Sequence, residues 1–186
     1  AVLYPSKSWI VTGSTDGQVR VWAIDGMQGR SPIAASSAPS SIQAMAIHPT
    51  GRHLAVGQTS GLIQVWDLTE DRGHARFSLR QEIAGIPDSI RQLGYSPDGR
   101  YAVACCQGGN VHFWHCSDGQ PAPLDLIRHE DGHRQEALAL AMHPQEQQAA
   151  TAGDDRVLRL WNLHTGLVTG TLEIGEGRVQ SLDYSP

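Results

Sequence analysis

Short apolar stretches recur along the chain, and turns rich in proline, glycine, aspartate and serine separate them. Within the stretches apolar and polar residues alternate, most clearly in residues 157–161, which read VLRLW. A period of two, with β-branched and large apolar side chains in excess, predicts β-strands. The pattern therefore predicts an all-β fold built from many short strands.

The apolar stretches belong to an internal repeat. Four segments align without gaps, and in each of them a proline precedes a tryptophan by 17 positions. The four tryptophans are 44, 48 and 47 residues apart, a period typical of repeat architectures. The aligned segments are residues 4–22, 48–66, 96–114 and 143–161, and residues 179–186 open a fifth copy.

Each repeat is predicted to contain four strands. Apolar residues at fixed offsets form a first strand, and a proline-centred turn follows it, most clearly at residues 96–99, which read SPDG. A second strand, a turn with glycine, aspartate or serine, and the alternating third strand come next. Fourth strands fit residues 75–83, 122–129 and 167–174, whereas residues 29–41 are too small and polar to place one. The predicted units are 1–37, 38–85, 86–132, 133–175 and the start of a fifth at 176–186.

The units resemble those of the WD-repeat β-propeller family over the whole chain. The residues that carry the resemblance are Trp66-Asp67, Trp161-Asn162, the turn at 96–99, Asp16-Gly17 and Gly132-His133. Two units depart from the family pattern, because Ala23 follows Trp22 and His115 follows Trp114. The resemblance implies a β-propeller of four-stranded antiparallel blades, of which about four are visible here in a ring that typically has about seven.

Two arrangements of the ring are compatible with the repeat. In the one that we expect, the units belong to a larger ring, and both ends of the segment have open edges. In the alternative, residues 178–186 supply the first strand that the N-terminal unit lacks, and a ring of four blades closes. Ladder hydrogen bonds between residues 179–183 and 9–12 would identify the alternative.

Residues 129–133 read HEDGH and match the H-E-x-x-H signature of zinc-dependent proteases. Histidines at i and i+4 hold one metal ion only on a helix, where Gly132 would cost about 1 kcal/mol relative to alanine. No well-placed third ligand follows, since Glu136 and Glu146 have no supporting pattern. We therefore expect a turn that leads into the connection between two units, with no zinc, no cofactor and no peptidase activity.

The family resemblance implies another role for the second histidine of HEDGH. It places a hydrogen-bonded tetrad within a blade, made by a turn histidine, a second-strand serine or threonine, a turn aspartate and the third-strand tryptophan. Buried indole and carboxylate groups need hydrogen-bond partners, so the set is expected to brace the blade rather than to catalyse a reaction. The positions are His133, Thr151, Asp155 and Trp161 in the fourth unit, and Thr12, Asp16 and Trp22 in the first, whose histidine position precedes residue 1.

The second and third units lack the tetrad residues. Their positions hold Ala38, Val56 and Ser60 around Trp66, and Ile86, Ala104 and Gly108 around Trp114. A half-satisfied buried polar network is less stable than an apolar one, which is a physical reason to keep or lose the set as a whole.

The amino-acid composition argues against some classes of binding partner. The net charge is −5, which gives no electrostatic footprint for nucleic-acid phosphates, and no apolar run is long enough for insertion into a membrane. The three cysteines, Cys105, Cys106 and Cys116, make a poor disulfide framework and are expected to be buried in a reducing compartment, the cytoplasm.

The function that these observations favour is a non-enzymatic platform for binding proteins or peptides, because loops on a rigid scaffold carry binding. An alternative is a sensing or docking segment of a longer multidomain chain whose catalytic domain, such as a kinase, NTPase or protease, lies elsewhere; remaining blades of that chain would then be partners too. The expected contact positions lie at turns between second and third strands and at the starts of first strands: Thr15, Thr59, Gln107, Asp154, Gln43, Arg91, Glu136 and Gln180.

Overall fold

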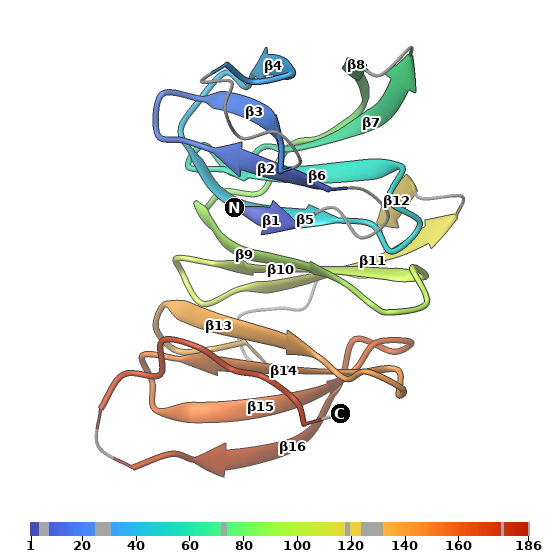
Figure 1. The fold of residues 1–186 in the computed structure, drawn as a ribbon. Helices are drawn as coiled ribbons and strands as arrows, with labels where there is room; N and C mark the ends of the chain where they lie inside the picture. The colour runs from blue at the N-terminus through green and yellow to red at the C-terminus, as the bar shows by residue number, and fades with distance from the viewer. Residues whose placement is uncertain are drawn as a thin grey trace.

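The computed structural model describes residues 1–3, 8–24, 31–71, 74–117, 120–123, 132–175 and 177–185. Sixteen strands form four antiparallel sheets of four strands each, stacked one upon another (Figure 1). Within each sheet the neighbouring strands are also consecutive in the chain. The all-β prediction and the four-stranded antiparallel units are therefore confirmed. The described ranges include no helix with the length and apolar character needed to cross a membrane.

The sheets follow the predicted units closely. The first two sheets consist of β1 (Val2–Leu3), β2 (Trp9–Gly13), β3 (Gln18–Ala23) and β4 (Ala34–Ser37), then β5 (Ile42–Ile47), β6 (His53–Gln58), β7 (Ile63–Asp71) and β8 (His74–Ile83). The last two consist of β9 (Ile90–Tyr95), β10 (Tyr101–Cys106), β11 (Val111–Ser117) and β12 (Gln120–Pro123), then β13 (Ala137–Met142), β14 (Gln148–Gly153), β15 (Val157–Asn162) and β16 (Val168–Glu173).

The first unit contains two strands that the sequence pattern did not reveal. Val2 and Leu3 pair with Val11 and Ile10, so a short first strand is present where we expected none. The fourth strand, β4, lies in the small and polar stretch, where Ala34 to Ser37 pair with β3. Backbone hydrogen bonds form these ladders, and a strand of alanine and serine can therefore pair although its side chains carry no apolar signal.

The ladder that would close a ring of four blades does not form. Residues 179–183 are not in a strand, and the edge of β2 that they would occupy pairs with β1 instead. Figure 1 shows the first and fourth sheets in different parts of the stack, with the second and third between them. Membership of a larger ring stays a prediction.

The second and third sheets use both of their faces for packing, and the first and fourth use one. Val11, Val19 and Val21 of the first sheet form one apolar cluster with residues of the second, among them Leu54 and Trp66. Two further clusters join the second sheet to the third and the third to the fourth in the same way. The repeat tryptophans of the last three units, Trp66, Trp114 and Trp161, therefore lie on the face that meets the preceding sheet.

The connections between sheets pass very close to the turns of the preceding sheet. Gly61 has a φ of +78°, and a Cβ atom there would lie 2.0 Å from the carbonyl oxygen of Ile86, in the next connection. Gly109 is placed similarly, with a φ of +92° and a Cβ position 2.1 Å from the oxygen of His133. Only glycine combines a positive φ with so close an approach of another backbone.

We predict that Gly61→Ala destabilises the protein through this collision as well as through its backbone angle. Gly85→Ala is the matched control, because Gly85 has a φ of +88° but open space around its Cβ position. The control should cost about 1–2 kcal/mol, the usual penalty for a left-handed residue, and Gly61→Ala at least about 2 kcal/mol more. Urea denaturation of both variants measures the difference. Equal losses would show that the connection moves aside freely.

Candidate functional site

The positions predicted for partner contacts are brought together at one end of the sheets. Turns between second and third strands are bonded to the start of their own sheet's first strand, with Thr59 N donating to Ser41 O at 3.0 Å and Gln107 N to Ser89 O at 2.9 Å. The connection to the next sheet also bonds to such turns, with Ala38 N donating to Gly17 O at 2.8 Å and His133 N to Gly109 O at 3.0 Å. We call this end the turn end. It consists of residues 14–17, 58–61, 106–109 and 153–156 together with residues 40–43, 88–91 and 134–137.

The turn end changes character along the stack. In the first two units the expected contact positions are exposed and uncharged, as at Thr15, Gln43 and Thr59, and Gln107 continues this surface into the third unit. Asp16, also at this end, is exposed and paired with Arg20. Toward the fourth unit the expected contact positions carry charges and are half-buried: Arg91 is ion-paired with Glu136, and Asp154 with Arg178. Gln180 is exposed, but it lies in a segment without strand pairing.

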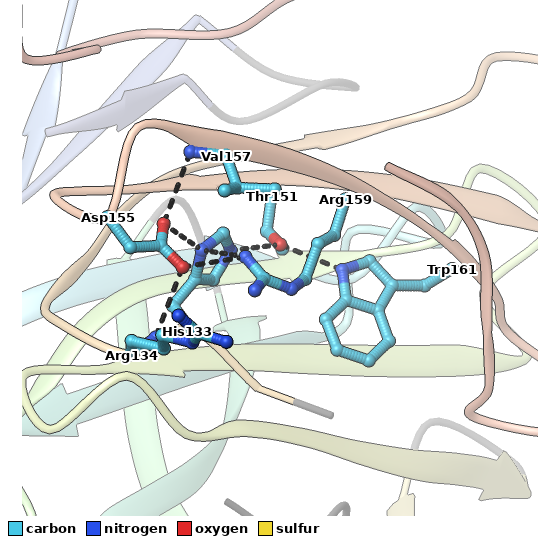
Figure 2. A network of polar contacts seen from close by, with 7 residues as sticks. All are labelled: His133, Arg134, Thr151, Asp155, Val157, Arg159 and Trp161. Atoms are coloured by element: carbon cyan, nitrogen blue, oxygen red, sulfur yellow. Dashed lines mark hydrogen bonds and ion pairs between the residues drawn. The ribbon is translucent and has the colours of Figure 1, made fainter. Parts of the chain in front are cut away.

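Below the turn end of the fourth unit lies a chain of hydrogen bonds that joins four side chains (Figure 2). Trp161 Nε1 donates to Thr151 Oγ1 at 2.7 Å, and the same oxygen lies 2.7 Å from His133 Nε2. His133 Nδ1 lies 2.9 Å from Asp155 Oδ1. The geometry implied by the family resemblance is thus present, with His133, Thr151 and Trp161 completely buried. We call these three side chains and that of Asp155 the brace.

One tautomer of His133 satisfies every member of this chain. With its hydrogen on Nδ1, the ring donates to Asp155, and Nε2 accepts from the hydroxyl of Thr151, which in turn accepts from Trp161. Arg159 Nη1 lies 2.8 Å from both His133 Nδ1 and Asp155 Oδ2. A protonated Nδ1 cannot accept a hydrogen bond, so Arg159 donates to the carboxylate.

Arg159 is a member of the brace that the sequence analysis missed. Its guanidinium, with the N–H groups of Arg134 and Val157, supplies donors to Asp155. A signal was available in the sequence, because an arginine stands two residues before the tryptophan in both units that keep the aspartate, as Arg20 and Arg159. The other two units have Gln64 and His112 there.

Burial and hydrogen bonding set the charges in the brace. Burial lowers the pKa of His133 below its ordinary value, although the carboxylate of Asp155 acts in the opposite direction. Burial by itself raises the pKa of Asp155, but the hydrogen bonds from His133 and Arg134 and the bond from Arg159 outweigh it, so that this pKa is lowered. The folded protein therefore holds a neutral imidazole beside an ionised carboxylate.

The same contacts answer the zinc question raised by HEDGH. Residues 129–131 lie outside the described residues, and Gly132 and His133 lead into the strand β13. Both ring nitrogens of His133 are within hydrogen-bond distance of Thr151 and Asp155, so neither is directed toward a metal ion. The absence of zinc stays a prediction, but the second histidine of the motif has a structural role.

The first unit holds half of the brace. Trp22 Nε1 donates to Thr12 Oγ1 at 2.8 Å, which matches the bond in the fourth unit. Asp16 organises its own turn instead, accepting from the backbone N–H of Gln18 at 2.9 Å and from the hydroxyl of Ser14. Its side chain is 57% exposed and pairs with Arg20.

The second unit has replaced the brace rather than lost it. Gln58, fully buried, accepts from Ser40 and donates to Gln64 Oε1 at 3.3 Å, and Gln64 donates to Glu82 at 2.7 Å. The tetrad positions hold Ala38, Val56 and Ser60, and the buried polar groups of this unit, Gln58 and Gln64, come from other positions. The indole N–H of Trp66, facing Val56 in place of a threonine, has no hydrogen-bond partner among the described residues.

The third unit also carries polar groups near its tryptophan, from positions outside the tetrad. His112 stacks on Trp114 with an interplanar angle of 12° and is 4% exposed, and burial lowers its pKa to about 4. Asp88 reaches over Gly108 from the preceding connection, since a Cβ atom on Gly108 would lie 1.9 Å from Asp88 Oδ2. A carboxylate thus approaches the site of the missing turn aspartate from another part of the chain.

The three cysteines are buried, as the sequence analysis predicted, and all three are free thiols. Burial raises the pKa of Cys106 and of Cys116 to about 12. The thiolate is the reactive form of cysteine, so these side chains are inert packing groups at neutral pH.

We predict that Asp155→Ala destabilises the protein by about 1–3 kcal/mol, because it leaves buried donors of His133 and Arg159 without an acceptor. Asp16→Ala is the matched control, since it removes the corresponding aspartate where the side chain is exposed, and it should cost less than about 1 kcal/mol. The double variant His133→Ala/Asp155→Ala should lose less than the sum of its single variants. Urea denaturation measures all four, and strictly additive losses would contradict a single network.

We also predict that His112 makes the protein sensitive to acid. Its pKa is lowered from 6.5 to about 4, so the unfolded chain binds a proton below pH 6.5 that the folded chain does not. Each unit of pKa corresponds to about 1.4 kcal/mol, so stability should fall by about 2 kcal/mol between pH 7 and pH 5 through this residue. Denaturation curves should show a weaker pH dependence in His112→Gln, and an unchanged one in His115→Gln, an exposed histidine on the same strand.

Comparison with known proteins agrees with the architecture. The sequence profile of the family described as "Nucleolar protein 10-like, N-terminal domain", a β-propeller, matches residues 2–183. Protein groucho of Drosophila melanogaster is 26% identical over 185 residues, which are 98% of this chain and 24% of that protein. The Protein LST8 homolog of the same organism is 27% identical over 157 residues, 83% of this chain and 48% of that protein. The chain thus spans less than half the length of either relative. On the match across residues 2–183, it belongs to the WD-repeat β-propellers, in the Nucleolar protein 10-like family.

Proposed function

We propose that this chain is a non-enzymatic platform that binds proteins or peptides at its turn end. The observation that carries the proposal is the backbone pairing at that end, where the connection to the next sheet bonds to the turn of the preceding unit, through Ala38 N to Gly17 O at 2.8 Å and His133 N to Gly109 O at 3.0 Å. Turns from successive units are thereby held side by side in fixed positions. A surface that needs little ordering on binding has a smaller entropic cost to offset.

The chemistry of the turn end favours a polar partner with little net charge. Thr15, Gln43, Thr59 and Gln107 offer exposed hydroxyl and amide groups, and the charges of Arg91 and Glu136 neutralise each other. Such groups donate and accept hydrogen bonds without favouring one sign of charge. A folded protein or an extended peptide with backbone groups to pair fits this surface better than a nucleic acid.

The brace supports a role without catalysis. Thr151, His133 and Asp155 have the residue types of a nucleophile, a base and an orienting acid. Thr151 is fully buried, however, and its hydroxyl accepts a bond from Trp161, so it is not presented to a substrate. The trio stabilises the blade that carries the turn end.

An alternative is that the chain is the sensing or docking segment of a longer protein whose catalytic domain lies outside these residues. The relatives are longer than the chain, which covers 24% of groucho and 48% of the LST8 homolog. The outer face of the fourth sheet agrees with further blades in the same ring, because Leu172 is 60% exposed whereas Val19 and Val21 of the first sheet are fully buried. Flanking sequence with or without an enzyme domain distinguishes the two proposals.

We place the chain in a reducing compartment such as the cytoplasm. Three free, buried cysteines support this, since proteins of oxidising compartments use such residues in disulfides. Fractionation of cells that produce a tagged protein tests the placement.

The platform is tested by placing a charge at the turn end. Gln107→Arg puts a cation on an exposed turn between second and third strands, and Gln145→Arg puts the same cation on an exposed turn at the opposite end. Proteins captured by the wild-type chain are identified by mass spectrometry, and the affinity of each for the purified variants is measured by calorimetry. We expect Gln107→Arg to weaken binding about tenfold or more, and Gln145→Arg to leave it unchanged. Equal affinity of the two variants for every captured protein would reject the turn end as the binding surface.

A further inference from the structure

We call the contact between two consecutive sheets a joint. The joints differ in the residues at one pair of positions, which lies far from the turn end. One position is the residue before the turn proline of a unit, and the other is the last residue of the following unit's first strand. The described pairs are His48 with Tyr95, Ser96 with Met142, and His143 with Tyr184. Histidine thus occurs opposite tyrosine at two joints, and where serine replaces the histidine, methionine replaces the tyrosine.

His48 joins the second sheet to the third. Its Nδ1 accepts the backbone N–H of Thr50 at 3.3 Å, which places the ring hydrogen on Nε2. Nε2 then donates to the carbonyl oxygen of Gly99 at 3.0 Å, in the turn of the next unit. The rings of His48 and Tyr95 meet edge to face with centroids 5.1 Å apart, a favourable arrangement of two aromatic groups.

The close approach of His48 requires a glycine at position 99, where the carbonyl oxygen accepts its hydrogen bond. A Cβ atom on Gly99 would lie 2.5 Å from Nε2 of His48, and its φ is +73°. The fourth unit has Glu146 at the corresponding turn position, and the joint before it has Ser96 in place of a histidine. A side chain is therefore tolerated at the joint where no imidazole approaches.

The joint without histidine is held differently. The hydroxyl of Ser96 donates to Asp98 at 2.6 Å and accepts from the N–H of Tyr101, so it stays within its own unit. The link to the fourth sheet comes from Gln147, whose side-chain amide donates to Asp98 at 2.6 Å. Contact between these turns therefore does not by itself need a histidine and a tyrosine.

His143 repeats the features of His48. Its Nδ1 accepts the N–H groups of Gln145 and Glu146, at 3.2 and 2.9 Å, which again places the hydrogen on Nε2. Its ring meets that of Tyr184 with centroids 4.8 Å apart and an interplanar angle of 63°. Tyr184 also donates its hydroxyl to Gln148 Oε1 at 3.0 Å, and Arg178 binds Asp154, so residues 178–184 are attached to the fourth sheet at both ends.

We propose that a histidine before the turn proline and a tyrosine that ends the next first strand form a matched contact between consecutive units. His143 and Tyr184 use this contact to seat residues 178–185 on the fourth sheet as the first strand of a fifth. The seating of a fifth strand rests on the larger ring proposed above, whereas the contact itself does not.

A double-mutant cycle at the complete joint tests the contact independently of the ring. His48→Asn keeps an acceptor for the N–H of Thr50 but removes Nε2 and the ring, and Tyr95→Leu removes the aromatic partner. We expect the double variant to change the folding equilibrium constant less than the product of the single changes, by about threefold or more. Ser96→Ala and Met142→Leu form the reference cycle, in which the effects should multiply. Multiplicative effects in both cycles would overturn the proposal.

Proteolysis tests the seat of residues 178–185. Trypsin cleavage after Arg178 requires this segment to leave the fourth sheet, so His143→Asn should speed the cleavage about fivefold or more. His164→Asn is the control, because His164 is an exposed histidine that contacts Tyr101 rather than Tyr184. Circular dichroism verifies that both variants are folded. An unchanged rate in folded His143→Asn, with coupling present at His48, would reject the fifth strand and leave the matched contact standing.

Discussion

Both faces of the sheets are apolar, and this constraint governs the rest of the structure. A sheet of four short strands with two apolar faces cannot bury both faces alone, so each sheet depends on its neighbours for stability. The valines of β3 illustrate this, because Val19 and Val21 are fully buried against the second sheet rather than within their own. Stability is therefore a property of the joints as much as of the sheets.

Stacked sheets leave polar backbone at their ends, and the joints must satisfy it. At the turn end the connection between sheets crosses the turn of the preceding unit, where Gly17, Gly61 and Gly109 make room for its carbonyl groups. Hydrogen bonds such as His133 N to Gly109 O at 3.0 Å then tie the two together. The surface proposed for binding is consequently built on backbone that is hydrogen-bonded to its own sheet and to the connection that crosses it. Its side chains can therefore vary without altering the shape of the surface.

Much of the fold could be predicted from the sequence, because the signals for it are local. The interval between proline and tryptophan fixed the units, and alternation located the second and third strands. The brace of the fourth unit was predicted residue by residue from the family resemblance, and its contacts are those observed. The strands β1 and β4 were missed because Val2–Leu3 is very short and Ala34–Ser37 has no apolar signal, so that only ladder pairing identifies them.

The polar interior of the second and third units could not be predicted, for a different reason. Gln58 and Asp88 reach the space of the brace from positions that have no equivalent in the tetrad, and His112 reaches it from the position of Arg159, which the tetrad does not include. In each unit this space is filled by a side chain of suitable length and polarity, and that side chain can come from different positions of the chain. Partner contacts at the turn end are harder still to predict, since exposed turn residues have no packing constraint that would reveal them.

The network around Gln58 has a consequence for how such repeats diverge. Ser40, Gln58, Gln64 and Glu82 form a chain of hydrogen bonds, and none of these four residues stands at a position of the histidine tetrad. Selection on a unit of this kind acts on whether its interior hydrogen bonds are satisfied, and not on which positions satisfy them. Repeats can then drift apart in sequence while their geometry is conserved, and a search that counts tetrads will find fewer blades than the ring contains.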